Sequence, residues 1–290
     1  MGQILIAGCG YVGTALGELC VLEGKTVWGL RRRSHLLPSR IRSITADLGK
    51  PETLRSLPSH LEFLLYTAAA DRSDDACYEA TYVEGLKNLI TALDEQKIYP
   101  KRAFFTSSTA VYAQTNGEWV DENSPTENKH FSGSRLLEAE RLLLASPFPW
   151  TVVRLSGIYG PNRTRLLEQI KQGEITARGS SSSYTNRIHR DDCAGLLNHL
   201  MRLKNPFDLY LGSDHEPARL CDVVGWLTQK LEIKPQDKAA LPSNSESRFR
   251  SNKRCCNARV LDSGYCFRYP TFREGYTALI EQVPSNEILR

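Results

Sequence analysis

The sequence predicts an α/β fold, with a doubly wound parallel sheet and a smaller C-terminal lobe. Apolar, strand-like runs alternate with helical patterns over the first two thirds of the chain, which is typical of βαβ units. A glycine-rich turn separates the first strand from the first helix, and the alternation becomes less regular from Arg163 onwards. With 290 residues, the chain is long enough for one large α/β body and an appended lobe.

Short apolar runs between turn residues predict strands at 3–7, 26–30, 43–45, 63–67, 102–107 and 151–155. Helices are predicted at 12–22, 78–96 and 132–145. In the second helix Leu86, Leu89, Ile90 and Leu93 recur at helical spacing, so one apolar face should pack on the sheet. A helix at 191–203 and a strand at 209–212 are expected to return to the same sheet.

These elements predict two lobes. The larger one comprises residues 1–160, with 187–212 returning to it, and the smaller one comprises 161–186 and 213–290. Within the smaller lobe, the serine run at 179–183 predicts a flexible loop. The polar, proline-containing stretch 235–252 predicts a small cap.

Composition excludes several classes of protein. The net charge of +4 is too small to imply a nucleic-acid partner, and the basic runs 31–33 and 248–254 are interpreted as solvated faces. No run approaches the roughly 20 apolar residues of a membrane span, and no signal peptide is evident, so we expect a cytoplasmic protein. The eight cysteines lack metal-ligand spacing and are expected to be reduced, including the adjacent Cys255 and Cys256.

A G-x-G-x-x-G motif at Gly8, Gly10 and Gly13 directly follows a predicted strand and begins a helix. The first glycine permits the tight turn, the second lets the backbone approach a pyrophosphate, and the third lets the helix pack on the strand. The anion would lie on the helix N-terminus, formed by Tyr11 and Val12. Cys9 is interpreted as a small spacer rather than a reactive thiol.

The end of the second predicted strand indicates which dinucleotide is bound. An NAD site usually carries Asp or Glu there, to bind the ribose 2′-hydroxyl. This chain instead reads Gly-Leu-Arg-Arg-Arg at 29–33. Guanidinium groups match a 2′-phosphate in charge and geometry, so we predict NADP, with Arg31 and Arg32 as ligands. NAD remains an alternative, as does a merely solvated basic turn.

Further motifs extend along the chain: Asp47-Leu48, YTAAA at 66–70, TSSTAVY at 106–112, DENSP at 121–125, VRLSGIYGP at 153–161, NRIHRDD at 186–192 and YPTFREGY at 269–276. With the glycine loop, they make the chain resemble the extended short-chain dehydrogenases/reductases almost from end to end. That group contains nucleoside-diphosphate-sugar epimerases and dehydratases. The resemblance implies that Asp47 and Leu48 lie by the adenine, and that Ala68 and Ala69 line the cofactor.

The same resemblance implies a catalytic Ser/Thr, Tyr and Lys. Ser108 stands in the serine position with Ser107 beside it, but the Tyr-x-x-x-Lys element is expected where Phe131 and Arg135 stand. Phenylalanine exchanges no proton, whereas arginine keeps the positive charge that holds the nicotinamide ribose. Tyr82 also replaces a family asparagine. The chain thus resembles an atypical member that lacks the usual pair.

Three side chains are candidates to replace the missing phenol. His130 is adjacent to the lost position, and imidazole titrates near neutral pH. Tyr112 and Tyr159 lie in motifs that line the family's cleft, although a structural or substrate-contact role is favoured for each. His189, Asp191 and Asp192 resemble a metal cluster, but the resemblance implies that this segment braces the lobes, so no metal is predicted.

Two functions follow as hypotheses. The first is an NADP-dependent enzyme that acts on a carbonyl or hydroxyl compound, with a nucleotide-sugar as one candidate and a non-standard acid/base. The second is a non-catalytic NADP(H)-binding redox sensor or regulatory protein. The only partner predicted is a small-molecule substrate, for which four arginines are available, and a homodimer is allowed. These arginines are Arg163, Arg165, Arg187 and Arg248.

Overall fold

The computed structural model describes residues 2–127, 130–234 and 251–281. The chain forms two compact units, each assembled from three separate segments. Unit 1 comprises Met1–Ala113, Ser124–Leu155 and Cys193–Gly212. Unit 2 comprises Gln114–Asn123, Ser156–Asp192 and Ser213–Arg290.

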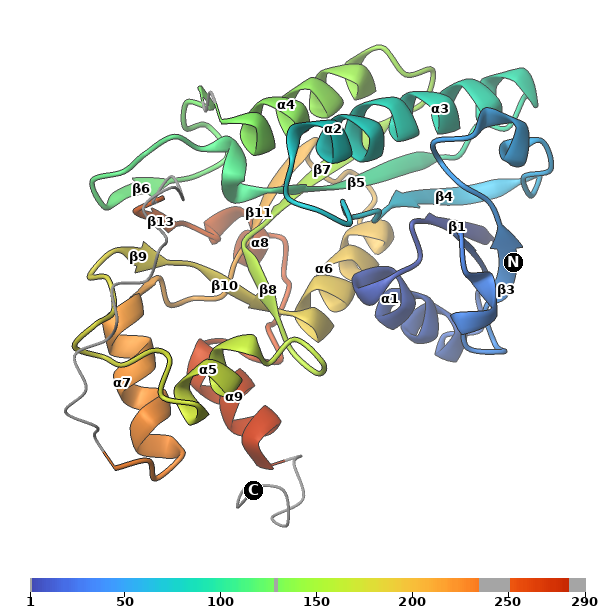
Figure 1. Ribbon diagram of the computed structural model, residues 1–290. Helices are drawn as coiled ribbons and strands as arrows, with labels where there is room; N and C mark the ends of the chain where they lie inside the picture. The colour runs from blue at the N-terminus through green and yellow to red at the C-terminus, as the bar shows by residue number, and fades with distance from the viewer. Residues whose placement is uncertain (1, 128–129, 235–250, 282–290) are drawn as a thin grey trace. The chain divides into compact units, whose positions relative to one another are not determined.

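Unit 1 contains a seven-stranded sheet in which every pair of neighbours is parallel. Its order is β11-β7-β5-β4-β1-β2-β3 (Figure 1). The strands are β1 (Gln3–Ala7), β2 (Thr26–Arg31), β3 (Arg42–Thr45), β4 (Leu61–Tyr66), β5 (Arg102–Ser108), β7 (Trp150–Leu155) and β11 (Leu209–Gly212). The strand order reverses direction between β1 and β4, as in doubly wound folds. The predicted fold class is confirmed, and each predicted strand is present.

Helices flank this sheet on both faces: α1 (Tyr11–Leu22), α2 (Asp75–Tyr78), α3 (Gly85–Glu95), α4 (Phe131–Leu144) and α6 (Arg190–Arg202). Single turns lie at η1 (Ser34–Leu36), η2 (Pro51–Leu54) and η4 (Thr109–Val111). The helix predicted at 78–96 is instead α2, a π-helical turn η3 (Glu79–Glu84) and α3. The Tyr66 hydroxyl donates a hydrogen bond to the Thr81 carbonyl within this wider turn.

A buried ion pair joins α4 to the sheet. Arg154 of β7 donates two hydrogen bonds to the Glu140 carboxylate, at 3.0 and 2.6 Å. Ser107 of β5 donates a third to the same carboxylate at 2.6 Å, and Arg154 also contacts the Tyr112 hydroxyl at 3.1 Å. This bidentate geometry fixes which side of α4 faces β5.

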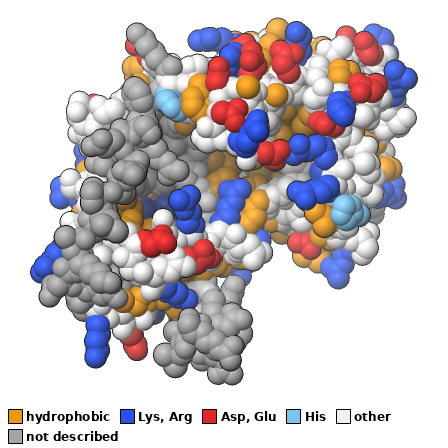
Figure 2. Space-filling view, viewed as in Figure 1, with side chains coloured by type: hydrophobic (Ala, Val, Ile, Leu, Met, Phe, Trp, Pro, Cys, Tyr) orange, Lys and Arg blue, Asp and Glu red, His pale blue; other side chains and the backbone are white. Residues whose placement is uncertain are grey.

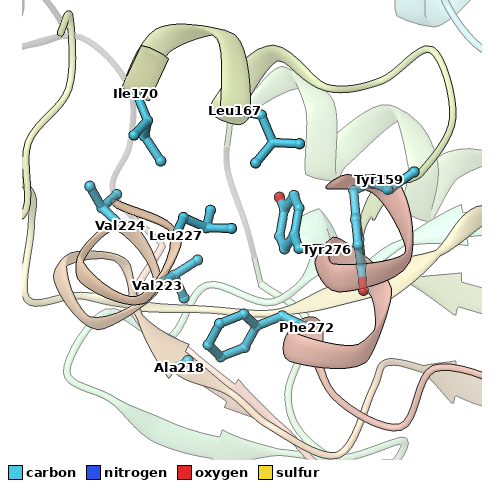
Figure 3. Close-up of a cluster of buried hydrophobic side chains, with 10 residues drawn as sticks. Tyr159, Leu167, Ile170, Ala218, Val223, Val224, Leu227, Phe272 and Tyr276 are labelled. Atoms are coloured by element: carbon cyan, nitrogen blue, oxygen red, sulfur yellow. The ribbon is translucent and has the colours of Figure 1, made fainter. Parts of the chain in front are cut away.

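Unit 2 is built from short strand pairs and helices. The pairs are β8 (Gly157–Tyr159) with β10 (Arg187–His189), β9 (Tyr184–Thr185) with β12 (Ala218–Arg219), and β6 (Glu118–Val120) with β13 (Lys253–Cys255). The helices are α5 (Arg165–Lys171), α7 (Leu220–Lys230), α8 (Ala258–Asp262) and α9 (Phe272–Glu281). The apolar faces of α5, α7 and α9 form a core around Phe272, Leu227 and Tyr276 (Figure 3).

The serine run and the predicted cap both belong to unit 2, and the cysteines are divided between the two units. Residues 179–183 form neither helix nor strand, as the serine run predicted. Residues 235–250 of the predicted cap, including Arg248, lie outside the described residues. All eight cysteines are free thiols. Within the described ranges, no helix is both long enough and apolar enough to cross a membrane.

Glu140→Gln is expected to destabilise the protein by about 3–5 kcal/mol, because it leaves the buried Arg154 guanidinium without a compensating charge. The matched control is Glu138→Gln on the same helix, whose side chain is 44% exposed in its pair with Arg135. That change should cost less than about 1 kcal/mol. Urea denaturation measures both, and equal losses would contradict a special role for the buried pair.

Candidate cofactor and active site

The candidate site residues gather at one edge of the unit 1 sheet. Gly8 follows β1, Ala68 and Ala69 follow β4, Arg31 ends β2 and Ser108 ends β5. Because these strands are parallel, their carboxyl ends share one edge. Ligands of doubly wound sheets bind at this edge, where the strand order reverses.

Two of the three glycines are required by the protein's own packing. Gly8 has a φ of +77°, and a Cβ placed on it would lie 2.3 Å from the Ala68 Cα. A Cβ on Gly13 would lie 2.6 Å from the Thr67 hydroxyl and 2.9 Å from the Ile6 side chain. Gly8 therefore permits the turn, and Gly13 permits α1 to pack against β1 and β4.

Gly10 differs from both. Among the described residues, a Cβ on Gly10 would meet only the Gly8 carbonyl oxygen, at 3.6 Å. Packing within the protein therefore does not require glycine at this position, whereas a ligand that approaches the backbone would. The loop thus fits a dinucleotide held by Gly8, Gly10 and the first turn of α1, with Tyr11, Val12 and Gly13. Such a cofactor would accept or donate a hydride.

The Cys9 side chain is buried, and burial raises the pKa of its thiol to about 11. The thiolate is therefore disfavoured at neutral pH, which agrees with its interpretation as a spacer.

The segments expected near the adenosine follow β2 and β3. Arg32 forms an exposed ion pair with Asp71 at 2.6 Å, whereas no carboxylate lies within residues 29–36. Asp47 accepts a hydrogen bond from the Gly49 N–H at 3.0 Å, and the Leu48 carbonyl accepts one from Asn88 at 2.9 Å. Basic side chains therefore mark the end of β2.

The two serines at the end of β5 have different surroundings. Ser107 is buried and donates its hydroxyl proton to Glu140. Ser108 accepts a hydrogen bond from the Ala110 N–H at 3.1 Å and so begins η4. Its hydroxyl proton is not used by that bond. Of the two, Ser108 is better suited to orient a substrate oxygen.

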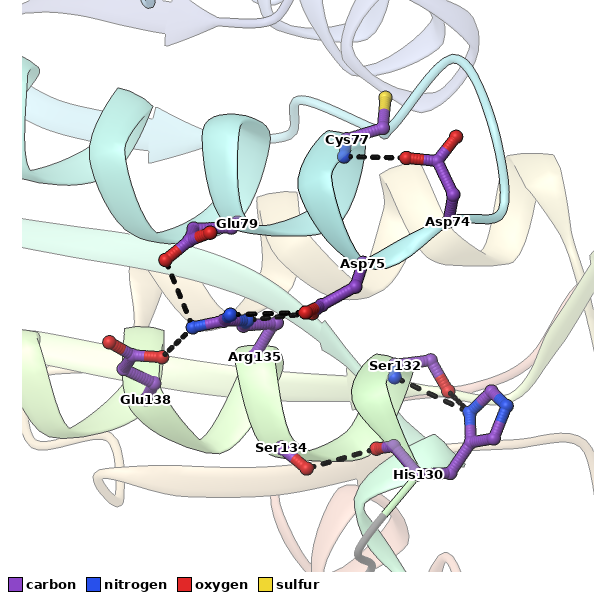
Figure 4. A network of polar contacts seen from close by, with 9 residues as sticks. All are labelled: Asp74, Asp75, Cys77, Glu79, His130, Ser132, Ser134, Arg135 and Glu138. Atoms are coloured by element: carbon purple, nitrogen blue, oxygen red, sulfur yellow. Dashed lines mark hydrogen bonds and ion pairs between the residues drawn. The ribbon is translucent and has the colours of Figure 1, made fainter.

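Arg135 is surrounded by carboxylates (Figure 4). Its guanidinium lies 2.8 Å from Asp75, 3.1 Å from Glu79 and 3.0 Å from Glu138. Acidic and basic side chains are intermixed over α2, α3 and α4 (Figure 2). This placement favours a role in holding α4 against α2 rather than the ribose contact implied by the family resemblance.

On the side of α4 that carries Arg135, Phe131 packs in a cluster of aromatic rings. The Phe131 ring lies 5.2 Å from the Tyr78 ring, which lies 5.1 Å from that of Tyr82. The positions expected to carry the family's Tyr and Lys, 131 and 135, therefore both face α2 and η3.

His130 caps the beginning of α4. Its Nδ1 accepts a hydrogen bond from the Ser132 backbone N–H at 3.4 Å and lies 2.9 Å from the Ser132 Oγ. The side chain is half-buried. An imidazole and a hydroxyl therefore form a pair in the first turn of α4.

The other two candidates for proton transfer are buried. Tyr112 receives the Arg154 hydrogen bond and is 1% exposed. Tyr159 packs in the unit 2 core with its ring stacked 4.6 Å from that of Tyr276, and burial raises the pKa of its phenol well above the usual value. These placements favour packing roles for both tyrosines.

The segment at 189–192 uses its polar groups internally. The fully buried Asp192 accepts hydrogen bonds from the backbone N–H groups of Arg268 and Tyr269, at 2.7 and 3.0 Å. The His189 Nδ1 accepts one from the Asp191 N–H at 3.2 Å. No group of metal-ligating side chains occurs within the described parts of the chain.

Sequence reasoning missed two buried features that involve ionisable side chains. Glu140 and Arg154 were not singled out, although Arg154 stands alone in an otherwise uncharged apolar strand, which was the available signal. Asp214 was also missed. It is 1% exposed, and within the described residues its Oδ2 has no hydrogen-bond partner.

The fold and the glycine loop define a nucleotide-binding α/β protein of the Rossmann type. The chain belongs to the NAD dependent epimerase/dehydratase family, whose model matches residues 4–209. The predicted family is therefore confirmed. A comparison with curated proteins found no match.

Three solved structures are similar. A putative NAD-dependent epimerase/dehydratase from Methylobacillus flagellatus is 38% identical, covers 97% of this chain and 98% of its own, and has a TM-score of 0.81. A conserved protein of unknown function from Silicibacter pomeroyi is 27% identical, with 97% and 99% covered and a TM-score of 0.77. The UDP-glucose 4-epimerase of Thermus thermophilus, in complex with NAD, is 17% identical, with 95% and 96% covered and a TM-score of 0.77.

Gly10→Ala should abolish dinucleotide binding while unfolding remains close to wild type, because an added Cβ would meet little of the protein itself but would stand where a dinucleotide would approach the backbone. Gly13→Ala is the matched comparison, since its Cβ would clash with Thr67 and Ile6, and it should lower stability. Cofactor fluorescence titration and circular dichroism give the two measurements. Wild-type affinity in folded Gly10→Ala would refute the assignment.

Asp214→Asn should stabilise the protein increasingly as pH rises. Burial raises the pKa of Asp214 to about 8, whereas aspartate in an unfolded chain titrates near 3.9. Between about pH 4 and 8 the unfolded state has lost a proton that the folded state keeps, so wild-type stability falls there. The advantage of the variant should grow by up to about 1.4 kcal/mol per pH unit in that window.

The test compares the melting temperatures of the wild type and Asp214→Asn across this pH range. The exposed Asp262→Asn serves as the control and should show no such trend. A pH-independent difference between wild type and Asp214→Asn would contradict the buried, protonated state of Asp214.

Proposed function

We propose that this protein is an NADP-dependent oxidoreductase of its family that interconverts a hydroxyl and a carbonyl group on a small molecule. The observation that carries the proposal is the open backbone at Gly10, in a loop whose other two glycines are explained by packing. Family membership supports a nicotinamide dinucleotide as the ligand of that loop. Ser108 is the last residue of β5, so it lies at the same edge of the sheet.

The proposal gives each group a limited task. The glycine loop and the first turn of α1 hold the pyrophosphate, because unpaired backbone N–H groups and the helix dipole favour an anion. Ser108 donates its hydroxyl proton in a hydrogen bond to the substrate oxygen. Tyr112 and Tyr159 are buried in packing contacts, so His130 is the remaining candidate of the three for a non-standard acid/base.

A nucleotide-linked sugar is the proposed substrate class. One structural neighbour is a UDP-glucose 4-epimerase. Arg163 and Arg165 are exposed in unit 2 and suit an anionic diphosphate, whereas Arg187 is buried and donates a hydrogen bond to Thr185 at 2.8 Å. Arg187 is therefore less suited to bind a diphosphate than Arg163 or Arg165.

NADP(H) should bind more tightly than NAD(H). Hydrogen bonds to a charged 2′-phosphate from Arg31 and Arg32 contribute roughly 1.5–3 kcal/mol, or about 10- to 150-fold in affinity. Arg31→Ala and Arg32→Ala should each weaken NADP(H) and leave NAD(H) nearly unchanged. Asp71→Asn should strengthen NADP(H), because Asp71 now competes for Arg32. Equal affinities of the wild type for both cofactors, measured by fluorescence titration, would reject this preference.

The activity itself is tested by following cofactor absorbance and product formation with a panel of aldehydes, ketones and UDP-sugars. Turnover that depends on NADP(H) and is lost in Gly10→Ala would support the proposal. A wild type that binds NADP(H) but converts nothing on the panel would overturn it and favour a redox sensor.

A further inference from the structure

The orientation of α4 about its own axis determines which side chains of its first turn face the candidate site. Glu140 bonds to Ser107, so its side of the helix faces β5. The buried residues of α4, which are Gly133, Leu136, Ala139 and Leu143, lie on the same arc. Helix α4 also contacts η4, the turn that begins at Ser108.

Phe131 lies on the other side of α4. It precedes Glu140 by nine positions, about two and a half turns, and so points roughly opposite to it. Its ring contact with Tyr78 confirms that direction. A phenol at position 131 would therefore point to α2 rather than to β5.

Ser132 lies on the arc that faces the sheet. It precedes Glu140 by eight positions, a little over two turns, and lies within about 80° of it. Its Oγ lies 2.9 Å from the His130 Nδ1 (Figure 4). That nitrogen also accepts from the Ser132 N–H, so in the neutral imidazole the proton resides on Nε2. Nδ1 is thus the basic atom beside the serine hydroxyl.

We infer that Ser132 and His130 together form the proton-transfer group of this site, with the Ser132 hydroxyl as the atom that contacts the substrate. The inference rests on the proposed function. In the oxidation direction, the proton of the substrate hydroxyl passes to the Ser132 Oγ while the Ser132 proton passes to the His130 Nδ1. The hydrogen on the adjacent substrate carbon leaves with its two electrons, as hydride, to the oxidised nicotinamide. Reduction of a carbonyl reverses each transfer.

The helix offers variants that separate this role from capping. Ser132→Ala removes the hydroxyl but keeps the backbone N–H that His130 caps. His130→Asn removes the imidazole but supplies a preferred N-cap side chain. Ser134→Ala is the matched control, because Ser134 belongs to the same turn and donates to the His130 carbonyl at 3.0 Å, yet lies on a different arc.

The test measures kcat for the best compound on the panel, together with NADP(H) affinity. Ser132→Ala and His130→Asn should each lower kcat by about 10²–10⁴-fold at unchanged cofactor affinity, and Ser134→Ala should stay near wild type. The double variant should lose no more than either single variant, because the two side chains act as a unit. Phe131→Tyr should gain nothing.

A second readout does not depend on turnover. The ¹⁵N chemical shift of the His130 Nδ1 should change in Ser132→Ala and not in Ser134→Ala. Wild-type kcat in Ser132→Ala, equal losses in Ser134→Ala, or multiplicative losses in the double variant would each overturn the inference. A wild type that binds NADP(H) without any turnover would overturn the proposed function as well, so the two failures are distinguishable.

Discussion

The buried pair of Glu140 and Arg154 is the constraint on which the architecture of unit 1 most depends. It joins α4 to β7, and through Ser107 to β5, in surroundings where both side chains are largely shielded from water. Two charges in such surroundings tolerate little displacement, since a broken pair would leave one of them unsolvated. The pair therefore fixes the rotation of α4 about its own axis. In that orientation, one side of α4 faces α2 and the other side faces the sheet. The carboxylates around Arg135 then stabilise the outer side.

The glycine loop shows how packing and ligand binding divide the same motif. Gly8 and Gly13 are explained by contacts inside the protein, whereas Gly10 is explained only by space left beside its backbone. A motif match alone does not separate these roles, because all three positions read as glycine. The distinction matters for experiments, since substitutions at the three positions should fail for different reasons.

Much of unit 1 could be predicted from the sequence because its central strands are mostly buried and read as nearly continuous apolar runs, such as Ile4–Ala7 of β1. Unit 2 was less predictable, because strands such as Tyr184–Thr185 are too short to show a period. The α4 site was predictable in position but not in orientation. The sequence places Phe131, Ser132 and Arg135 at the beginning of one helix, whereas only the partners of Arg135 and Glu140 show which way each residue points. Likewise the π-helical turn at Glu79–Glu84 has no signature in the helical pattern.

The segmented make-up of the two units has a consequence for biosynthesis. Strand β11 forms one edge of the seven-stranded sheet, and it lies near the end of the last segment of unit 1. The ribosome must therefore release more than two hundred residues before that sheet is complete, and segments of unit 2 emerge in the meantime. At about 5–20 residues per second, synthesis from the end of β7 at Leu155 to the end of β11 at Gly212 takes about 3–11 s, and during that time β7 presents an unpaired edge. Because segments of the two units alternate along the sequence, we expect the nascent chain to depend on chaperones during translation.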